Sequence, residues 1–170
     1  MAIYMKYGDI PGDATQAGHE EWINVDHFNW NAEWTISNRA KVTNKTRDNK
    51  HPALHDVTIR KQIDAASKHL LDAVCRPKDT RGETCIIRFL IISALTEKDA
   101  DPDRQRYLEY KFHNSLITHV SVEADSDKRP TETVIINFTA VEMCVWPLHR
   151  TNERLPPLRF DRFDKVVDQA

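Results

Sequence analysis

The chain has 170 residues, of which 40% are hydrophobic and 29% are charged, and its formal net charge is −2. This length and composition predict a single domain, residues 1–170, with a substantial core. The small net charge gives no electrostatic reason to expect nucleic acid or an anionic membrane as the main partner. The four glycines form neither of the common glycine-rich phosphate-binding motifs.

The cysteines and the N-terminal segment bear on where the protein resides. Three cysteines lie far apart and form no CxxC motif, so free thiols are expected and a disulfide framework is not. The first residues contain no signal-like apolar run, and no run approaches the ~18 apolar residues of a membrane span. We expect synthesis in the cytoplasm, no membrane insertion, and any export by a route without a cleaved signal peptide.

The first half of the chain predicts two strands. Residues 3–7 form a short strand, and residues 8–19 form a loop with three of the four glycines. Residues 21–36, EWINVDHFNWNAEWTI, alternate bulky apolar with short polar residues from Phe28 onward, which is typical of a strand. A straight strand of this length would span roughly 50 Å, whereas strands usually have about five or six residues. We therefore expect a bent strand in a closed sheet, with one face on the core and the other facing water.

The middle of the chain predicts a long polar loop, a strand and a helix. Residues 38–54 are polar and charged and lack periodicity, whereas residues 55–63 have the pattern of a strand. Asp64 stands at the N-cap position of a helix over residues 65–75, which Pro77 stops. The narrow apolar stripe of this helix consists of Ala66, Leu70, Leu71 and Val74.

The second half predicts three further strands. Residues 84–93 are apolar on both faces apart from Arg88, so this strand should be covered twice, by the helix or another subunit in addition to the core. Residues 107–122 alternate, and residues 133–146 form the last long strand, with a bulge or bend near Ala140. The tail after Pro147 is mixed. Because strands predominate and βαβ alternation is absent, an all-β barrel or sandwich is expected.

Candidate chemical sites are few. His51, His55 and Asp56 form a cluster, but the adjacent proline argues against a helix that would present both histidines to a metal. His113 and His119 are six residues apart on one predicted strand, roughly 20 Å, and cannot share a metal there. The sequence contains no GxSxG, HExxH or CGxCW motif. We therefore expect no enzyme activity, no metal and no cofactor.

Asp26 falls on the mostly apolar face of the long strand. A buried carboxylate there would have a raised pKa and could act in acid–base catalysis. The alternatives are that Asp26 bonds a backbone N–H or an arginine, or that a bend exposes it.

Several segments, taken in order, resemble the haemolysin-coregulated protein (Hcp) family, the inner-tube proteins of bacterial type VI secretion. The segments are AIYMKYGDIPGDA, EEWINVDHFNWNAEW, DVTIRKQIDAASKHLLDAVC, YLEYKFHNSLITHVSVEAD and RPTETVIINFTAVEMCVW. The resemblance covers most of residues 2–146. Residues 38–54 depart from it because they are charged where many relatives are glycine-rich, and residues 147–170 form a C-terminal extension without a matching pattern.

The resemblance implies a closed β-barrel of long antiparallel strands with one short α-helix packed on it. It also implies a homohexameric ring with a wide channel, and rings stacked into a tube inside a contractile sheath with a spike at its tip. The tube is secreted and can hold small effector proteins.

Carried onto this sequence, the resemblance assigns two kinds of surface. The polar side of the long strand, Asn29, Asn31 and Glu33, would face the channel. Ring or subunit contacts would involve Arg39, Lys41, Lys45, Arg47, Lys50, Ile87 and Ile91. The basic residues could also meet the acidic segment 97–103 of another subunit.

Three alternatives stay open. The chain could be a small-ligand-binding β-barrel that uses the polar strand face as a pocket. It could be a hydrolytic enzyme exported by the same apparatus, or a phage-like tail-tube protein with the same architecture.

Overall fold

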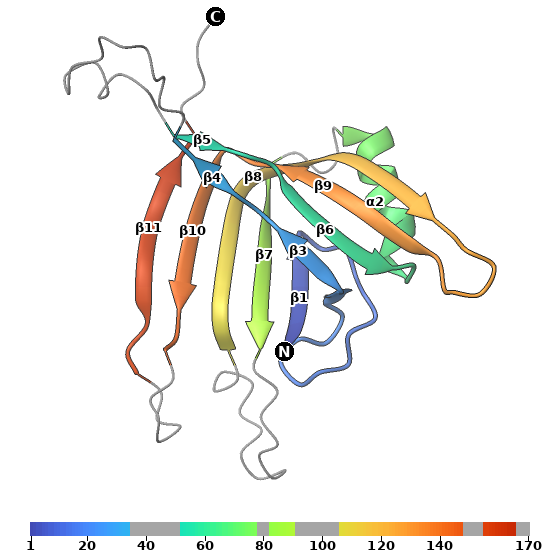
Figure 1. Ribbon diagram of the computed structural model, residues 1–170, viewed down its shortest axis with the longest axis horizontal. Coiled ribbons are helices and arrows are strands. Elements are labelled where there is room, and N and C mark those ends of the chain that lie inside the picture. Colours follow the sequence, from blue (N-terminus) through green and yellow to red (C-terminus); the bar gives the residue numbers. More distant parts are fainter. Residues whose placement is uncertain (35–51, 78–81, 91–105, 148–154, 166–170) are drawn as a thin grey trace, which may run out of the picture.

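The computed structural model describes residues 1–34, 52–77, 82–90, 106–147 and 155–165. Within these residues the chain is mostly β, with one short helix, as predicted (Figure 1). In chain order the elements are β1 (Ala2–Tyr7), β2 (Ile23–Val25), β3 (His27–Asn29), β4 (Ala32–Glu33), β5 (Ala53–Leu54), β6 (Val57–Gln62), α2 (Ala66–Cys75), β7 (Glu83–Leu90), β8 (Arg106–Glu123), β9 (Thr131–Asn137), β10 (Ala140–Val145) and β11 (Leu158–Asp164).

The strands form one antiparallel sheet in the order β2-β1-β7-β8-β9-β6-β3, and β10 and β11 branch from β8. A separate small ribbon pairs β4 with β5. β8 holds the two parts together, because its first half pairs with β7 and β10 and its second half pairs with β9. Figure 1 shows β8 curving from the long strands on the left to β9 on the right.

The alternation predicted over residues 107–122 changes phase within β8. Phe112 is buried before the change, and Ser115 and Ile117 are buried after it. Between them Asn114 has a left-handed backbone conformation, with φ of 49°. A single residue in this conformation turns the strand and reverses which side chains point inward. The strand prediction is therefore confirmed, but the prediction of one continuous apolar face is wrong.

The described part of the long strand predicted over residues 21–36, up to residue 34, contains three short strands, and a bend at Asp26 separates the first two. Before the bend the odd-numbered residues Ile23 and Val25 are buried, and after it the even-numbered Phe28 and Trp30 pack against the core. The Asp26 N–H donates a hydrogen bond of 2.9 Å to the Arg60 carbonyl oxygen. β2 and β3 stand at the two ends of the strand order, and Asp26 alone separates them along the chain. Trp34, expected on the core face, is exposed.

The core lies between the β2-β1-β7 part of the sheet and the β9-β6-β3 part. Its largest fully buried apolar side chains include Tyr7, Phe112, Phe138, Met5 and Leu70. Aromatic rings form much of it: Trp30 lies 5.7 Å from Phe112 and 6.2 Å from Phe138, centroid to centroid. This ring cluster explains why the aromatic residues of segment 28–30 face inward.

β7 is covered on both faces near Leu90, as its composition predicted, but the second cover is different from the one expected. Cys85, Ile87 and Phe89 face the main core. On the other side, Leu90 packs with Tyr4 and Ala14 in a second cluster that Trp22 borders. The connection between β1 and β2 thus supplies the cover for Leu90, and neither the helix nor another subunit is required there. α2 lies instead against β8.

The end of the chain differs from the prediction in one respect. β9 and β10 are separated at Phe138 and Thr139, which confirms the expected bend near Ala140. A further strand, β11, then pairs with β10. Its apolar residues Leu158, Phe160 and Phe163 are not evenly spaced along the sequence. This spacing matches the β10–β11 pairing, which shifts register between Val141 and Met143. This irregularity concealed the strand in the sequence.

Candidate assembly surfaces

The described histidines singled out in the sequence do not share a site. His113 Nε2 is 2.9 Å from Glu142 Oε1, and His119 is exposed elsewhere on β8. His55 Nε2 lies 3.2 Å from Glu33 Oε1. Among the described residues, no group of three or more histidine, cysteine, aspartate or glutamate side chains is placed to hold a metal ion. His51 lies outside the described residues.

Asp26 is exposed at the bend between β2 and β3. The interpretation of Asp26 as a buried acid–base group is therefore wrong, and the alternative that a bend exposes it is correct. Of the cysteines, Cys75 is exposed, Cys144 is half-buried and Cys85 is fully buried. Burial raises the pKa of the Cys85 thiol well above its ordinary value. In the part of the chain that the structure describes, no helix combines the length and the apolar character needed to cross a membrane.

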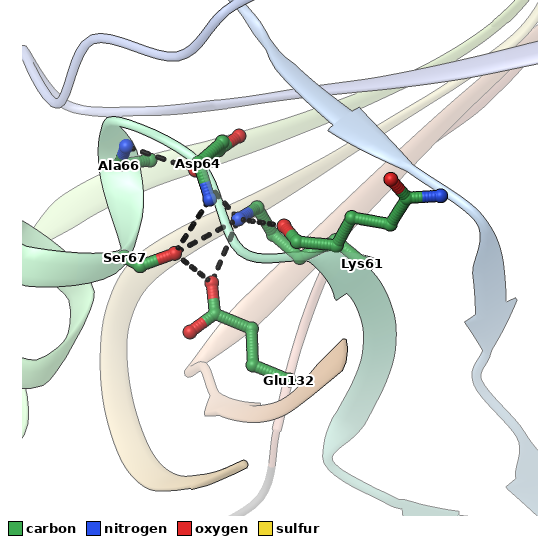
Figure 2. A network of polar contacts seen from close by, with 6 residues as sticks. Lys61, Asp64, Ala66, Ser67 and Glu132 are labelled. Carbon is green, nitrogen blue, oxygen red and sulfur yellow. Dashed lines mark hydrogen bonds and ion pairs between the residues drawn. The ribbon is translucent and has the colours of Figure 1, made fainter. Parts of the chain in front are cut away.

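A cluster of charged groups is buried where α2 meets β6 and β9. Lys61 Nζ donates hydrogen bonds of 2.6 Å to Asp64 Oδ1, 2.7 Å to Glu132 Oε1 and 2.8 Å to the Gln62 carbonyl oxygen (Figure 2). The Lys61 side chain is 0% exposed and the Glu132 side chain is 1% exposed. A buried lysine of this kind requires partners for its charge, and with Ser67 Oγ at 3.3 Å four acceptors surround it.

The same cluster fixes the start of the helix. Asp64 Oδ1 accepts a hydrogen bond of 2.9 Å from the Ala66 N–H at the first residue of α2. The predicted N-cap position is one residue off, because the N-cap of α2 is Ala65, which makes no side-chain capping bond. Ser67 Oγ donates to Glu132 Oε1 at 2.8 Å and accepts from the Asp64 N–H at 3.0 Å. The side chains thus fasten α2 to the sheet, as Figure 2 shows. Because the lysine amine is fully enclosed and hydrogen-bonded, the cluster is structural.

A second charge network lies around Glu109, on the side of β7 and β8 that faces away from the core. Glu109 is buried and pairs with Arg88, and Arg106 and Lys111 lie 3.7 and 3.8 Å from its carboxylate oxygens. The network borders a hollow of about 360 Å³ between β8, β10 and β11. Charged side chains of both signs line this hollow: Arg106, Glu109, Lys111, Glu142, Arg159, Asp161 and Arg162. Ligand pockets are predominantly apolar, so this lining favours a polar contact surface.

β11 is the most open element of the sheet. Its side chains are exposed on both faces except Phe163, which is half-buried. Leu158 is 64% exposed and Phe160 is 47% exposed. Within the described residues β11 pairs only with β10, so its outer edge is open. An open edge that carries apolar side chains is a surface on which another chain can pair.

The predicted channel residues lie on a different surface. Asn29 on β3, Asn31 just before β4, and Glu33 on β4 are all exposed. The Asn31 carbonyl oxygen accepts a hydrogen bond of 3.1 Å from the His55 N–H, so this polar strip continues into the β4–β5 ribbon.

The predicted contact residues fall into two groups. Ile87 is described, and its side chain is fully buried in the subunit's own core. Arg39, Lys41, Lys45, Arg47, Lys50 and Ile91 lie outside the described residues.

These elements define a mostly antiparallel β-protein with one short helix and, among the described residues, an open sheet edge at β11. A family model described as "Type VI secretion system effector, Hcp" matches residues 4–144. The chain therefore belongs to the Hcp family of type VI secretion proteins, and the resemblance drawn from its sequence is confirmed. It is a structural component of that system, in a family not known for enzymes.

Solved structures share this fold. A structure described as a type six secretion system protein has a TM-score of 0.79 and 18% identity, covering 92% of this chain and 91% of that one. A type VI secretion system effector from Yersinia pestis has a TM-score of 0.68 and 20% identity, covering 96% and 99%. Hcp1 from Salmonella typhimurium has a TM-score of 0.64 and 18% identity, covering 94% and 93%. No curated protein matches the sequence.

Proposed function

We propose that the chain is the subunit of a hexameric ring, and that such rings stack into the inner tube of the type VI secretion machine. Membership of the family supports the tube role. The observation that carries assembly is β11, whose edge is open among the described residues and whose side chains are exposed on both faces. Copies arranged head to tail, with β11 of one against a different surface of the next, form a closed ring when the rotation closes.

The subunit itself is proposed to be a closed β-barrel that uses the whole chain, residues 1–170, as one domain. The bend at Asp26 supports closure, since it joins β2 to β3 at the two ends of the strand order. Directly after β11, the Lys165 N–H donates a hydrogen bond of 2.6 Å to the carbonyl oxygen of Thr139, the residue before β10. This anchor supports placing the C-terminal extension in the same domain.

The ring would present the exposed strip of Asn29, Asn31 and Glu33 to its channel, where small effector proteins are held. The basic residues of segment 39–50 would contact the next ring or subunit. Burial of apolar surface such as Leu158 and Phe160 between neighbours would drive closure of the ring. A contractile sheath and a spike would be the further partners. Assembly would occur in the cytoplasm, followed by secretion without a cleaved signal peptide.

The test is the mass and shape of the purified protein. Native mass spectrometry is expected to give six subunits, and negative-stain microscopy is expected to show annular particles. Phe160→Asp should abolish the rings and leave a folded monomer, because its side chain is half exposed and contributes little to the fold. Leu71→Asp is the matched control, since Leu71 is 52% exposed on α2 and is expected to leave the rings intact.

Two results would contradict the proposal. A wild-type protein that stays monomeric or dimeric at high concentration favours the small-ligand-binding barrel. Rings that survive Phe160→Asp show that β11 is not the assembly edge. If the chain is a tube subunit, deletion of its gene in cells should stop secretion of all effectors. If it is an exported enzyme, deletion should remove only the activity of that enzyme.

A further inference from the structure

His19 is a buried histidine in the connection between β1 and β2, residues 8–22. Only 1% of it is exposed. Its ring stacks on Tyr4 at 5.3 Å and meets the edge of Trp22 at 4.9 Å, centroid to centroid. Among the described residues neither Nδ1 nor Nε2 has a hydrogen-bond partner. A polar group buried without a partner is unusual, so this ring needs an explanation.

Taken together, the titratable and charged groups around the ring favour its neutral form. Tyr4 stacks on it from β1. Arg88 on β7 and Arg106 on β8 disfavour a proton on the ring, whereas Glu20 on the connection favours one. The guanidinium of Arg88 sits 4.6 Å from the centre of the Trp22 ring. Arg88 and Arg106 both pair with Glu109, so that one carboxylate is shared between them. A proton on His19 would add a third positive charge beside Arg88 and Arg106.

The pKa of His19 is lowered accordingly. Burial is the largest cause and Arg88 the second, with a smaller contribution from Arg106. The backbone at Ala17 and the carboxylate of Glu20 act in the opposite direction and do not reverse the shift. The native protein therefore contains neutral His19.

The connection depends on the contacts that His19 makes. The hydrogen bonds within residues 8–22 join backbone groups close in sequence. The Trp22 N–H donates to the His19 carbonyl oxygen at 3.1 Å, and the Glu21 N–H donates to the Ala14 carbonyl oxygen at 2.9 Å. The apolar contacts of the connection are with Tyr4 and Leu90, through Ala14 and Trp22. Loss of the His19 ring from this cluster would uncover the outer face of β1 and β7.

We propose that residues 8–22 form an acid-sensitive latch, which stays closed over β1 and β7 while His19 is neutral and opens when His19 takes up a proton. The direction follows from linkage. Because the native pKa lies below the ordinary value of 6.5, the open state binds the proton more readily. The latch is therefore fully stable above the ordinary histidine pKa and loses stability as the pH falls below it. Opening exposes Tyr4 and Leu90 and adds positive charge beside Arg88.

Hydrogen–deuterium exchange tests this proposal on the intact protein. Exchange of peptides from residues 8–22, corrected for the intrinsic rate, is measured at about pH 7.5 and about pH 5, on either side of the histidine range. The wild type should show a several-fold rise in opening between the two pH values, because the open state binds the proton more readily. His19→Phe keeps an aromatic ring but cannot titrate, so it should show no such rise. His119→Phe, which changes an exposed histidine on β8, should retain it.

A second measurement needs no variant. Exchange at the imidazole C2 position, followed by mass spectrometry, reports the protonation of each histidine in the wild type. His19 should titrate below the ordinary histidine value of 6.5. The proposal is overturned if His19 titrates at or above the ordinary value, or if His19→Phe opens on acidification as the wild type does.

Discussion

Replacement of Lys61 by methionine tests whether the buried charge cluster fastens α2 to the sheet. Methionine keeps most of the apolar stem and removes the amine, so the change leaves Glu132 and Asp64 without their cation. Their carboxylates lie 2.7 and 2.6 Å from Lys61 Nζ, and their side chains are only 1% and 10% exposed. Removing one partner of a buried pair costs about 3–5 kcal/mol. In a chain of this size each kcal/mol lowers the melting temperature by about 2–4 °C, so a fall of roughly 6–20 °C is expected.

The assay is thermal unfolding followed by circular dichroism, at one protein concentration because assembly adds stability. Lys61→Met combined with Glu132→Leu removes both charges of the pair that joins β6 to β9 and should recover part of the loss. Arg76→Ala is the matched control on α2. Its pair with Asp72 has side chains that are 69% and 40% exposed, and such pairs contribute about 0.5 kcal/mol or less. The reasoning fails if Lys61→Met costs no more than Arg76→Ala, or if the double variant is as unstable as the sum of its single changes.

Two further predictions concern the surface and the core. Asn29→Arg places a bulky charge on the exposed strip and should weaken retention of effectors, measured by co-purification, while native mass spectrometry still shows rings; loss of the rings would instead show that Asn29 lies at a subunit contact. Cys85 should resist alkylation in the native state, because it is fully buried and its pKa is raised, whereas the exposed Cys75 should react. Mass spectrometry of the labelled peptides checks this, and rapid labelling of Cys85 would contradict its burial.

Local signals in the sequence were enough for several elements. β1, β6 and α2 follow from short apolar patterns, a helix-start signal at Asp64 and a stop at Pro77, all of which act within a few residues. The bends at Asp26 and Asn114 were harder to place, because a change of inward face depends on which strands pair on either side. β11 was missed because its apolar spacing matches an irregular register with β10.

The Lys61 cluster illustrates the limit on predicting sites. Lys61 follows Val57 and Ile59 on the inward face of β6, and Glu132 precedes Val134 and Ile136 on the inward face of β9. A charged residue at an inward position is a signal that the sequence contains. Its meaning depends on the pairing of β6 with β9, which joins residues 71 positions apart and is not a local property. The exposed edge of β11 depends in the same way on long-range pairing.

The register that places Lys61 opposite Glu132 also restricts which substitutions can accumulate as this protein evolves. A lineage that loses either charge passes through a form with an isolated ion in its interior, so a single replacement is strongly disfavoured. The two positions are therefore expected to be inherited as a unit and to be exchanged together, either for another ion pair or for two apolar side chains of similar volume.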